Sequence, residues 1–144
     1  MRKGLIIFLI LLSQITFAQK RDKWIQLGLF TGSIALNAIG SGLNYNNHKD
    51  LGHAFEAASI GTLLIIPLVI NVDKKKWFWY ITSYSLLRYG MFDPIYNVAK
   101  GREMFYQGNT GALDKISRNF SPEFIYTTKA LAFCIGVTIN LGKF

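Results

Sequence analysis

The feature that most constrains this chain is the alternation of long apolar stretches with short charged clusters. Apolar stretches of roughly 20 residues are separated by clusters such as Lys20-Arg21-Asp22-Lys23 and Asp73-Lys74-Lys75-Lys76. A helix of about 20 residues matches the roughly 30 Å hydrocarbon core of a bilayer, and basic residues are typical of the ends of such helices. Because 51% of the residues are hydrophobic, we predict an all-α integral membrane protein.

The N-terminus has the layout of a secretory signal peptide. Arg2 and Lys3 precede an apolar run at residues 5–12, and Thr16 and Ala18 place small residues just before Gln19. We therefore predict that residues 1–18 are a cleaved signal peptide and that residues 19–144 form a single helical transmembrane domain. The alternative, an uncleaved anchor, would need roughly 20 apolar residues to span. This run is shorter.

The rest of the chain divides into four apolar segments. The first covers residues 24–45, and its Gly28-x-x-x-Gly32 spacing predicts close helix packing within the bundle. The second is expected to begin with Asp50 as its N-cap and to reach residue 72, with a kink at Pro67. The third begins at Trp77, in an aromatic cluster after three lysines, and is expected to stop near Gly90.

A short interfacial helix and a polar loop are predicted between the third and fourth segments. Asp93 followed by Pro94 has the pattern of an N-cap and first helical residue, which predicts a separate helix at residues 93–99. Residues 100–120 are rich in glycine and polar residues and are expected to be a loop. Ser121, Pro122 and Glu123 then predict the start of a fourth helix reaching residue 141. The lone cysteine, Cys134, cannot form an intramolecular disulfide and is expected to be buried in that helix.

Four spans would bring the ionisable residues of the apolar segments towards one surface. His53 and Glu56 follow the start of the second segment, Arg88 is near the end of the third, and Lys129 is near the start of the fourth. A charge inside a bilayer is costly unless it is paired or reaches water. We therefore expect Glu56 to pair with Arg88 or Lys129. The alternative is that the two basic side chains extend to the lipid headgroups at the membrane surface.

These residues define a candidate polar pocket on one side of the membrane. The candidates are His53, Glu56, Arg88, Asp93, Asn97 and Lys129. The main hypothesis is a non-enzymatic interaction or small-solute-binding module. The alternative is a membrane-embedded enzyme in which His53, oriented by Glu56 or Asp50, acts as general base on a lipid-linked substrate whose phosphate Arg88 and Lys129 would hold.

No metal or cofactor is predicted. His53-x-x-Glu56 places two potential ligands on one helix face, but carboxylate bundles use Glu-x-x-His on two helices, and here the order is reversed and a second copy is missing. There is also no Gly-x-Ser-x-Gly and no His-Glu-x-x-His. A structural histidine explains the residue equally well.

The stretch after the third segment carries a recognisable pattern. Arg88-x4-Asp93-Pro-x-Tyr-Asn97, Tyr106-x-Gly-Asn-Thr110 and Leu113-Asp114-Lys115 together resemble a pattern of small bacterial multi-pass membrane proteins, to which no function is assigned. The resemblance implies a membrane protein with a shared polar loop. The candidate loop residues are Tyr106, Asn109, Thr110 and Asp114. Read from the residues alone, Asp93 and Asp114 are helix caps and the glycines are turns.

The charge distribution bears on partners and orientation. The net charge is +8, but the basic residues stand at segment ends and no nucleic-acid-binding motif accompanies them. We therefore do not expect nucleic acid as a partner. The expected partners are membrane lipids, a second copy of the chain or another membrane protein. We expect a multi-pass protein of the inner membrane. A cleaved signal places the mature N-terminus outside. The basic residues mildly oppose this orientation, because they are usually more numerous on the cytoplasmic side, and here seven lie on the side of the mature N-terminus and five on the other side. The seven are Lys20, Arg21, Lys23, Lys74, Lys75, Lys76 and Lys143, and the five are Lys49, Lys100, Arg102, Lys115 and Arg118.

Overall fold

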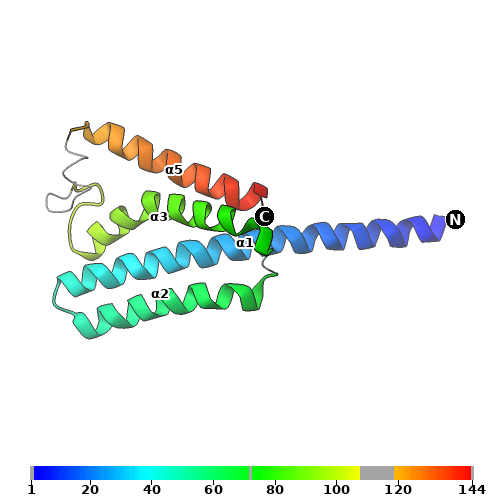
Figure 1. Cartoon of the computed structure of the whole chain (residues 1–144), viewed down its shortest axis with the longest axis horizontal. Helices are drawn as coiled ribbons and strands as arrows, with labels where there is room; N and C mark the ends of the chain where they lie inside the picture. Colours follow the sequence, from blue (N-terminus) through cyan, green and yellow to red (C-terminus); the bar gives the residue numbers. More distant parts are fainter. Residues whose placement is uncertain (1, 72, 108–118, 144) are drawn as a thin grey trace.

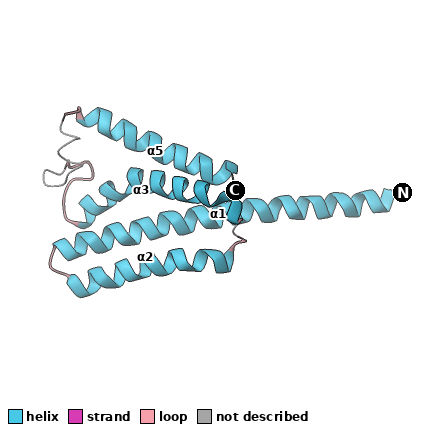
Figure 2. Ribbon diagram, viewed as in Figure 1, coloured by secondary structure: helices cyan, strands magenta, loops and turns pink. Residues whose placement is uncertain are grey.

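The computed structural model describes residues 2–71, 73–107 and 119–143, and the side chains from residue 21 to residue 142 within those ranges. These residues form helices and the segments that connect them, with no strand among them (Figure 2). The elements are α1 (Arg2–Tyr45), α2 (Lys49–Val69), the 3₁₀ turn η1 (Lys74–Lys76), α3 (Trp77–Ala99) and α5 (Pro122–Lys143). The all-α prediction is confirmed for the described part of the chain.

The helices lie side by side in the order α2, α1, α3, α5 (Figure 1). The extensive contacts are those of α1 with α2, α3 with α5 and α1 with α3, while α1 touches α5 only slightly and α2 makes little or no contact with α3 or α5. The central helices are therefore α1 and α3. The two outer helices each pack along one side only, which leaves most of their surface uncovered.

One continuous helix joins the predicted signal segment to the first apolar segment. α1 has 44 residues, which corresponds to about 66 Å, and its N-terminal part extends beyond the other helices (Figure 1). We expected a new helix at residue 24, but the polar linker of residues 19–23 contains no glycine or proline, so nothing in it interrupts the helix. Cleavage at residue 18 stays a prediction.

Both ends of α2 differ from the expected bounds. The residue before the helix is His48, whose side chain makes no capping bond, and Asp50 lies inside the first turn. The prediction of an Asp50 N-cap is therefore wrong, although a carboxylate in the first turn still favours the positive end of the helix dipole. The helix continues two residues past Pro67 and ends at Val69, where Ile70 adopts an extended conformation.

The predicted break in the third segment is absent. α3 runs without interruption through Gly90, Asp93 and Pro94 to Ala99, so Asp93 is not an N-cap and residues 93–99 are not a separate helix. Gly90 has another use, because a Cβ there would lie 2.8 Å from the carbonyl oxygen of Lys129 in α5. A proline frees only the carbonyl four residues earlier, which a membrane-type helix tolerates when its neighbours pack closely.

The start of α5 agrees with the sequence. The hydroxyl of Ser121 accepts a hydrogen bond from the backbone N–H of Phe124 at 3.3 Å, Pro122 is the first helical residue, and Glu123 lies in the first turn. The helix ends at Lys143, two residues beyond the expected limit. A capping serine accepts a hydrogen bond from one of the otherwise unpaired N–H groups of a helix start, and a proline at the first position removes another because it has no N–H.

Small residues form the contact between α1 and α2. A Cβ on Gly40 would lie 2.6 Å from the carbonyl oxygen of Gly52, so the two backbones approach closely. The hydroxyls of Ser33 and Ser59 lie 3.0 Å apart, and Ser59 donates to the carbonyl of Ser33 at 2.8 Å. Hydrogen bonds between small residues on close helices are typical of packing inside membranes.

The expected packing motif at residues 28–32 is not used. A Cβ added at Gly28 or Gly32 would meet nothing within 4 Å, so neither glycine lies against another helix. The prediction that this pair packs within the bundle is therefore wrong. The spacing alone could not show which face of the helix meets its neighbours.

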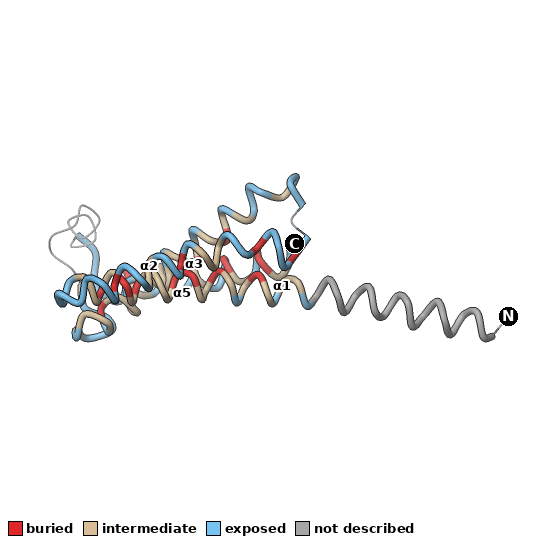
Figure 3. Tube along the Cα trace, turned by 90° about the horizontal axis from the view of Figure 1, so that it is seen from below, coloured by how far each residue is buried: buried red, intermediate tan, exposed pale blue. Residues whose placement is uncertain are grey.

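The apolar core is small and the exterior is strongly apolar. The core cluster consists of Phe30, Ile34, Ile66, Ile70 and Leu87, and buried positions alternate with uncovered ones along the helices (Figure 3). The large exposed apolar side chains on the two outer helices include Ile60, Leu64, Ile65, Leu68, Val69, Phe124, Leu131 and Ile135. Cys134 is also exposed, which contradicts its predicted burial.

Two helices are long and apolar enough to cross a membrane. They are α2, over Lys49–Val69, and α5, over Pro122–Gly142. In the most apolar part of each helix, only 17% of the residues are buried. Core helices of water-soluble proteins satisfy the same criterion of length and composition, but they are mostly buried. These two are the least covered helices of the row.

Candidate functional site

The predicted polar residues do not form one cluster. Glu56 and His53 belong to α2 and Lys129 to α5, and the central helices α1 and α3 lie between them. The expectation that these faces converge is wrong, because four helices in a row bring together only neighbouring pairs. The polar groups are instead divided among three contacts, one between each pair of neighbours.

Glu56 is held by neutral or weakly basic partners at the contact of α2 with α1. One carboxylate oxygen accepts a hydrogen bond from the hydroxyl of Ser41 at 3.1 Å, and the other lies 3.4 Å from Nδ1 of His53. It pairs with neither Arg88 nor Lys129, so that prediction is wrong. The His53 side chain is 69% exposed, and its predicted closeness to Glu56 is confirmed.

Arg88 joins α3 to α1. Its guanidinium donates to the side-chain oxygen of Asn37 at 2.8 Å and lies 4.4 Å from the centre of the Phe92 ring. Asn37 and Ser41 are one turn apart on α1. Through these two neutral side chains, α1 holds the guanidinium of Arg88 and the carboxylate of Glu56 at successive turns. This replaces the direct ion pair that we expected.

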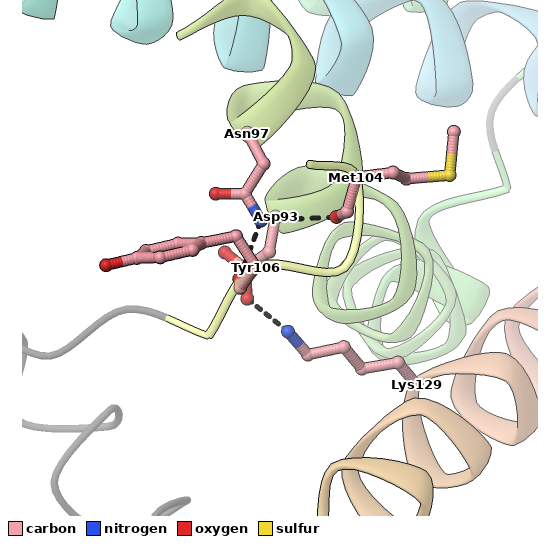
Figure 4. A network of polar contacts seen from close by, with 5 residues as sticks. All are labelled: Asp93, Asn97, Met104, Tyr106 and Lys129. Atoms are coloured by element: carbon pink, nitrogen blue, oxygen red, sulfur yellow. Dashed lines mark hydrogen bonds and ion pairs between the residues drawn. The ribbon is translucent and has the colours of Figure 1, made fainter. Parts of the chain in front are cut away.

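Asp93 and Lys129 form the ion pair between α3 and α5 (Figure 4). The lysine side chain is only 15% exposed, whereas the aspartate is 53% exposed. Asp93, which we predicted to cap a short helix, therefore pairs with Lys129, one of the two cations predicted to pair with Glu56. The continuity of α3 explains this, because it carries Asp93 one turn beyond Gly90, where α5 approaches closely.

Asn97 fixes the chain that follows α3. It is buried, and its side-chain amide donates to the carbonyl oxygens of Met104 at 3.2 Å and Tyr106 at 2.8 Å (Figure 4). Two of the predicted site residues, Asn97 and Tyr106, are thus brought together, with the contact made through the backbone of Tyr106. The predicted loop residues Asn109, Thr110 and Asp114 lie outside the described residues.

Two buried amides at the opposite end of the helices were not predicted. Gln26 of α1 is 2% exposed, and Asn140 of α5 is fully buried. The side-chain nitrogen of Gln26 and both the nitrogen and the oxygen of the Asn140 side chain have no hydrogen-bond partner among the described residues. Lys23, one turn before Gln26, donates to the carbonyl of Leu141 at 3.0 Å and so ties α1 to the end of α5. In the sequence, these amides were hidden among the polar residues common at helix ends.

The arrangement gives the polar groups structural roles at the helix contacts. Among the described residues, no group of three or more histidine, cysteine, aspartate or glutamate side chains is placed to hold a metal ion. The predicted phosphate-holding pair, Arg88 and Lys129, is divided between two helix contacts. The three groups around Glu56, Arg88 and Asp93 can each hold two neighbouring helices in register.

Comparisons with protein-family models, curated proteins and solved structures found no match for this chain. The resemblance carried by the stretch from Arg88 to Lys115 therefore stays a prediction.

Proposed function

We propose that this chain is a multi-pass protein of the bacterial inner membrane whose four helices cross the bilayer, and that it acts as a non-enzymatic interaction or small-solute-binding module. The observation that carries the proposal is the uncovered apolar surface of the outer helices. Leu64 and Leu68 of α2 are 68% and 83% exposed, and Leu131 of α5 is 57% exposed. Lipid would cover such surfaces, whereas water would make them prone to aggregation.

The dimensions of the other helices support the same proposal. α2, α3 and α5 contain 21, 23 and 22 residues, which corresponds to about 32 to 35 Å each and matches a hydrocarbon core of roughly 30 Å. α3 is less apolar, but it is a central helix, and its charged residues Arg88 and Asp93 have partners on α1 and α5. Paired polar groups are the form in which charges are tolerated at membrane depth.

One substitution on the α2 surface separates a membrane from an aqueous environment. Leu64→Asp places a carboxylate in the middle of the uncovered face, which should cost about 2.5 to 3.5 kcal/mol of insertion free energy in a bilayer but almost nothing at a water-exposed position. Asn71→Asp, just beyond the helix at an exposed position, is the matched control. We expect only Leu64→Asp to reduce the amount of protein that resists carbonate extraction from membranes. Wild-type protein released by carbonate would overturn the proposal.

The orientation can be tested with single cysteines. In a Cys134→Ser background, Lys75→Cys and Lys49→Cys place thiols at exposed positions at the two ends of α2. The signal-based orientation predicts that an impermeant reagent added from outside labels position 75 and not position 49. The reverse pattern would support the orientation favoured by the basic flanks.

The enzymatic alternative rests on one observation, the contact between His53 and Glu56. An exposed imidazole beside a carboxylate has the arrangement of an oriented general base. His53→Gln keeps hydrogen bonding but removes the acid–base capacity, so a non-enzymatic module should retain its cellular function at normal abundance. Loss of function with unchanged abundance and unfolding temperature would favour the enzyme.

A further inference from the structure

The turn after α3 places two cations at a defined position. Gly101 has a φ of 77°, its N–H donates to the carbonyl of Val98 at 2.9 Å, and the N–H of Arg102 donates to that of Asn97 at 2.8 Å. This pair of bonds defines a Schellman motif, which needs a left-handed residue at the glycine position. The motif fixes the backbone between Lys100 and Arg102 and so the positions from which their side chains extend.

Tyrosine rings from three segments hold these cations. The Lys100 ammonium lies 3.2 Å from the centre of the Tyr45 ring at the end of α1, and it donates to the hydroxyl of Tyr96 at 3.1 Å. The Arg102 guanidinium lies 4.3 Å from the centre of the Tyr106 ring and 5.7 Å from that of Tyr45. Cation–π contacts of this kind orient a charge without neutralising it.

The surrounding backbone keeps the rings in place. The two hydrogen bonds of Asn97 hold the segment that carries Tyr106, and the side chain of Asn46 donates to the carbonyl of Ala99 at 3.2 Å, which joins the end of α1 to the end of α3. The site is therefore assembled from α1, α3 and the following turn before any ligand arrives.

Among the described residues, no carboxylate forms an ion pair with Lys100 or Arg102. The ion pairs among the described residues are those of Arg21 with Asp22, His53 with Glu56, and Lys129 with Asp93. Lys100 uses one of its three donors on Tyr96, and the guanidinium of Arg102 makes no side-chain hydrogen bond within the described part of the chain. Two oriented positive charges with unused donors suit an anion with several oxygens, and guanidinium matches phosphate geometry.

We propose that Lys100 and Arg102, held by Tyr45, Tyr96 and Tyr106, bind the phosphate of an anionic lipid headgroup. The inference rests on the proposed membrane function, which places the ends of α1 and α3 at the bilayer surface, where tyrosines and basic residues contact headgroups. A free phosphate offers the same oxygens. The lipid is the ligand favoured here because the site stands at the end of apolar helices, where acyl chains would lie along the exposed apolar surface.

The test measures lipid binding by the full-length protein in neutral detergent. Wild type, Lys100→Gln/Arg102→Gln and the control Lys74→Gln/Lys75→Gln are titrated with phosphatidylglycerol and with phosphatidylcholine. The control removes the same charge from exposed lysines at the opposite end of the helices. We expect wild type and control to prefer phosphatidylglycerol, and the Lys100/Arg102 variant to lose at least about tenfold in affinity for it. Equal losses in both variants would overturn the proposal, because bulk charge would then explain binding.

Two further measurements complete the test. Tyr45→Leu leaves both charges but removes the ring that holds them, and it should also weaken phosphatidylglycerol binding at an unchanged unfolding temperature. Inorganic phosphate is used as competitor, and displacement of the lipid at equal concentration would overturn the lipid assignment in favour of a water-soluble phosphate. Carbonate extraction of the same variants reports separately on the membrane proposal, so that failure of either proposal is recognisable.

Discussion

The contact of α1 with α2 and the contact of α3 with α5 are built from the same kinds of parts. Each has a glycine that allows close approach, Gly40 in one and Gly90 in the other, and a buried serine that donates to a carbonyl of the facing helix, Ser59 and Ser83 respectively. They differ in the partner of the carboxylate. Glu56 meets a hydroxyl and an imidazole, whereas Asp93 meets an ammonium.

This difference shows that the partner a carboxylate finds outside its own helix comes from the helix packed beside it, which is Ser41 of α1 for Glu56 and Lys129 of α5 for Asp93. Glu56 and Lys129 were expected at one level of the membrane, but they lie on the two outer helices. A chain whose helices pack in a row can pair charges only between neighbours. Helix order, which sequence depth does not reveal, decided the pairing.

The largest expected effect comes from closing the space between α1 and α2. Gly40→Leu forces side-chain atoms into the backbone of Gly52, and overpacking of this kind should lower the free energy of unfolding by about 3 kcal/mol. Gly28→Leu is the matched control on the same helix, because a side chain there meets nothing within 4 Å. Thermal unfolding in detergent is the measurement. Equal destabilisation by both substitutions would contradict the helix contact described above.

A second prediction concerns the two carboxylates. In a double-mutant cycle, Asp93→Asn and Lys129→Gln should show a coupling energy of about 1 to 2 kcal/mol, because each substitution leaves the other group without its partner. The same cycle with Glu56→Gln and Lys129→Gln should be additive, since two helices separate the groups. Unfolding free energies of the single and double variants decide between these outcomes. Coupling of Glu56 with Lys129 would restore the single polar cluster.

A third prediction concerns Gln26, whose buried side-chain nitrogen has no hydrogen-bond partner among the described residues. Gln26→Met removes a buried amide while nearly conserving its size and shape, and it should raise the free energy of unfolding by about 1 kcal/mol. Gln26→Glu, which introduces a charge at the same buried position, should have the opposite effect. Stabilisation is measured by thermal unfolding in detergent. A clear loss of stability in Gln26→Met would show that the amide has a partner which the described residues do not provide.

The smallest expected effect compares the starts of the two outer helices. Ser121 caps α5 through its hydroxyl, whereas His48 before α2 makes no capping bond. Ser121→Ala should lower the unfolding free energy by about 0.5 to 1 kcal/mol, because an N–H of the first turn loses its partner. His48→Ala should leave it nearly unchanged. Equal effects at both positions would show that the serine bond does not stabilise the helix.

The sequence by itself determined the helices and several of their ends. Apolar segments of membrane length, the lysine turn before Trp77 and the serine–proline start of α5 are local patterns, and the structure has helices at each of them. Local patterns failed where packing mattered. Gly90 and Asp93-Pro94 have the pattern of a helix end and a new start, yet close contact with α5 keeps α3 continuous.

Only the tertiary structure decided which polar residues meet. The side-by-side order of the helices assigned Glu56 to Ser41, Arg88 to Asn37 and Lys129 to Asp93, and the Schellman turn at Gly101 brought Lys100 and Arg102 to tyrosines that lie far apart in the chain. The physical reason is the range of the interactions. Helix formation depends on neighbours three and four residues away, whereas hydrogen bonds and ion pairs between helices depend on which faces pack together.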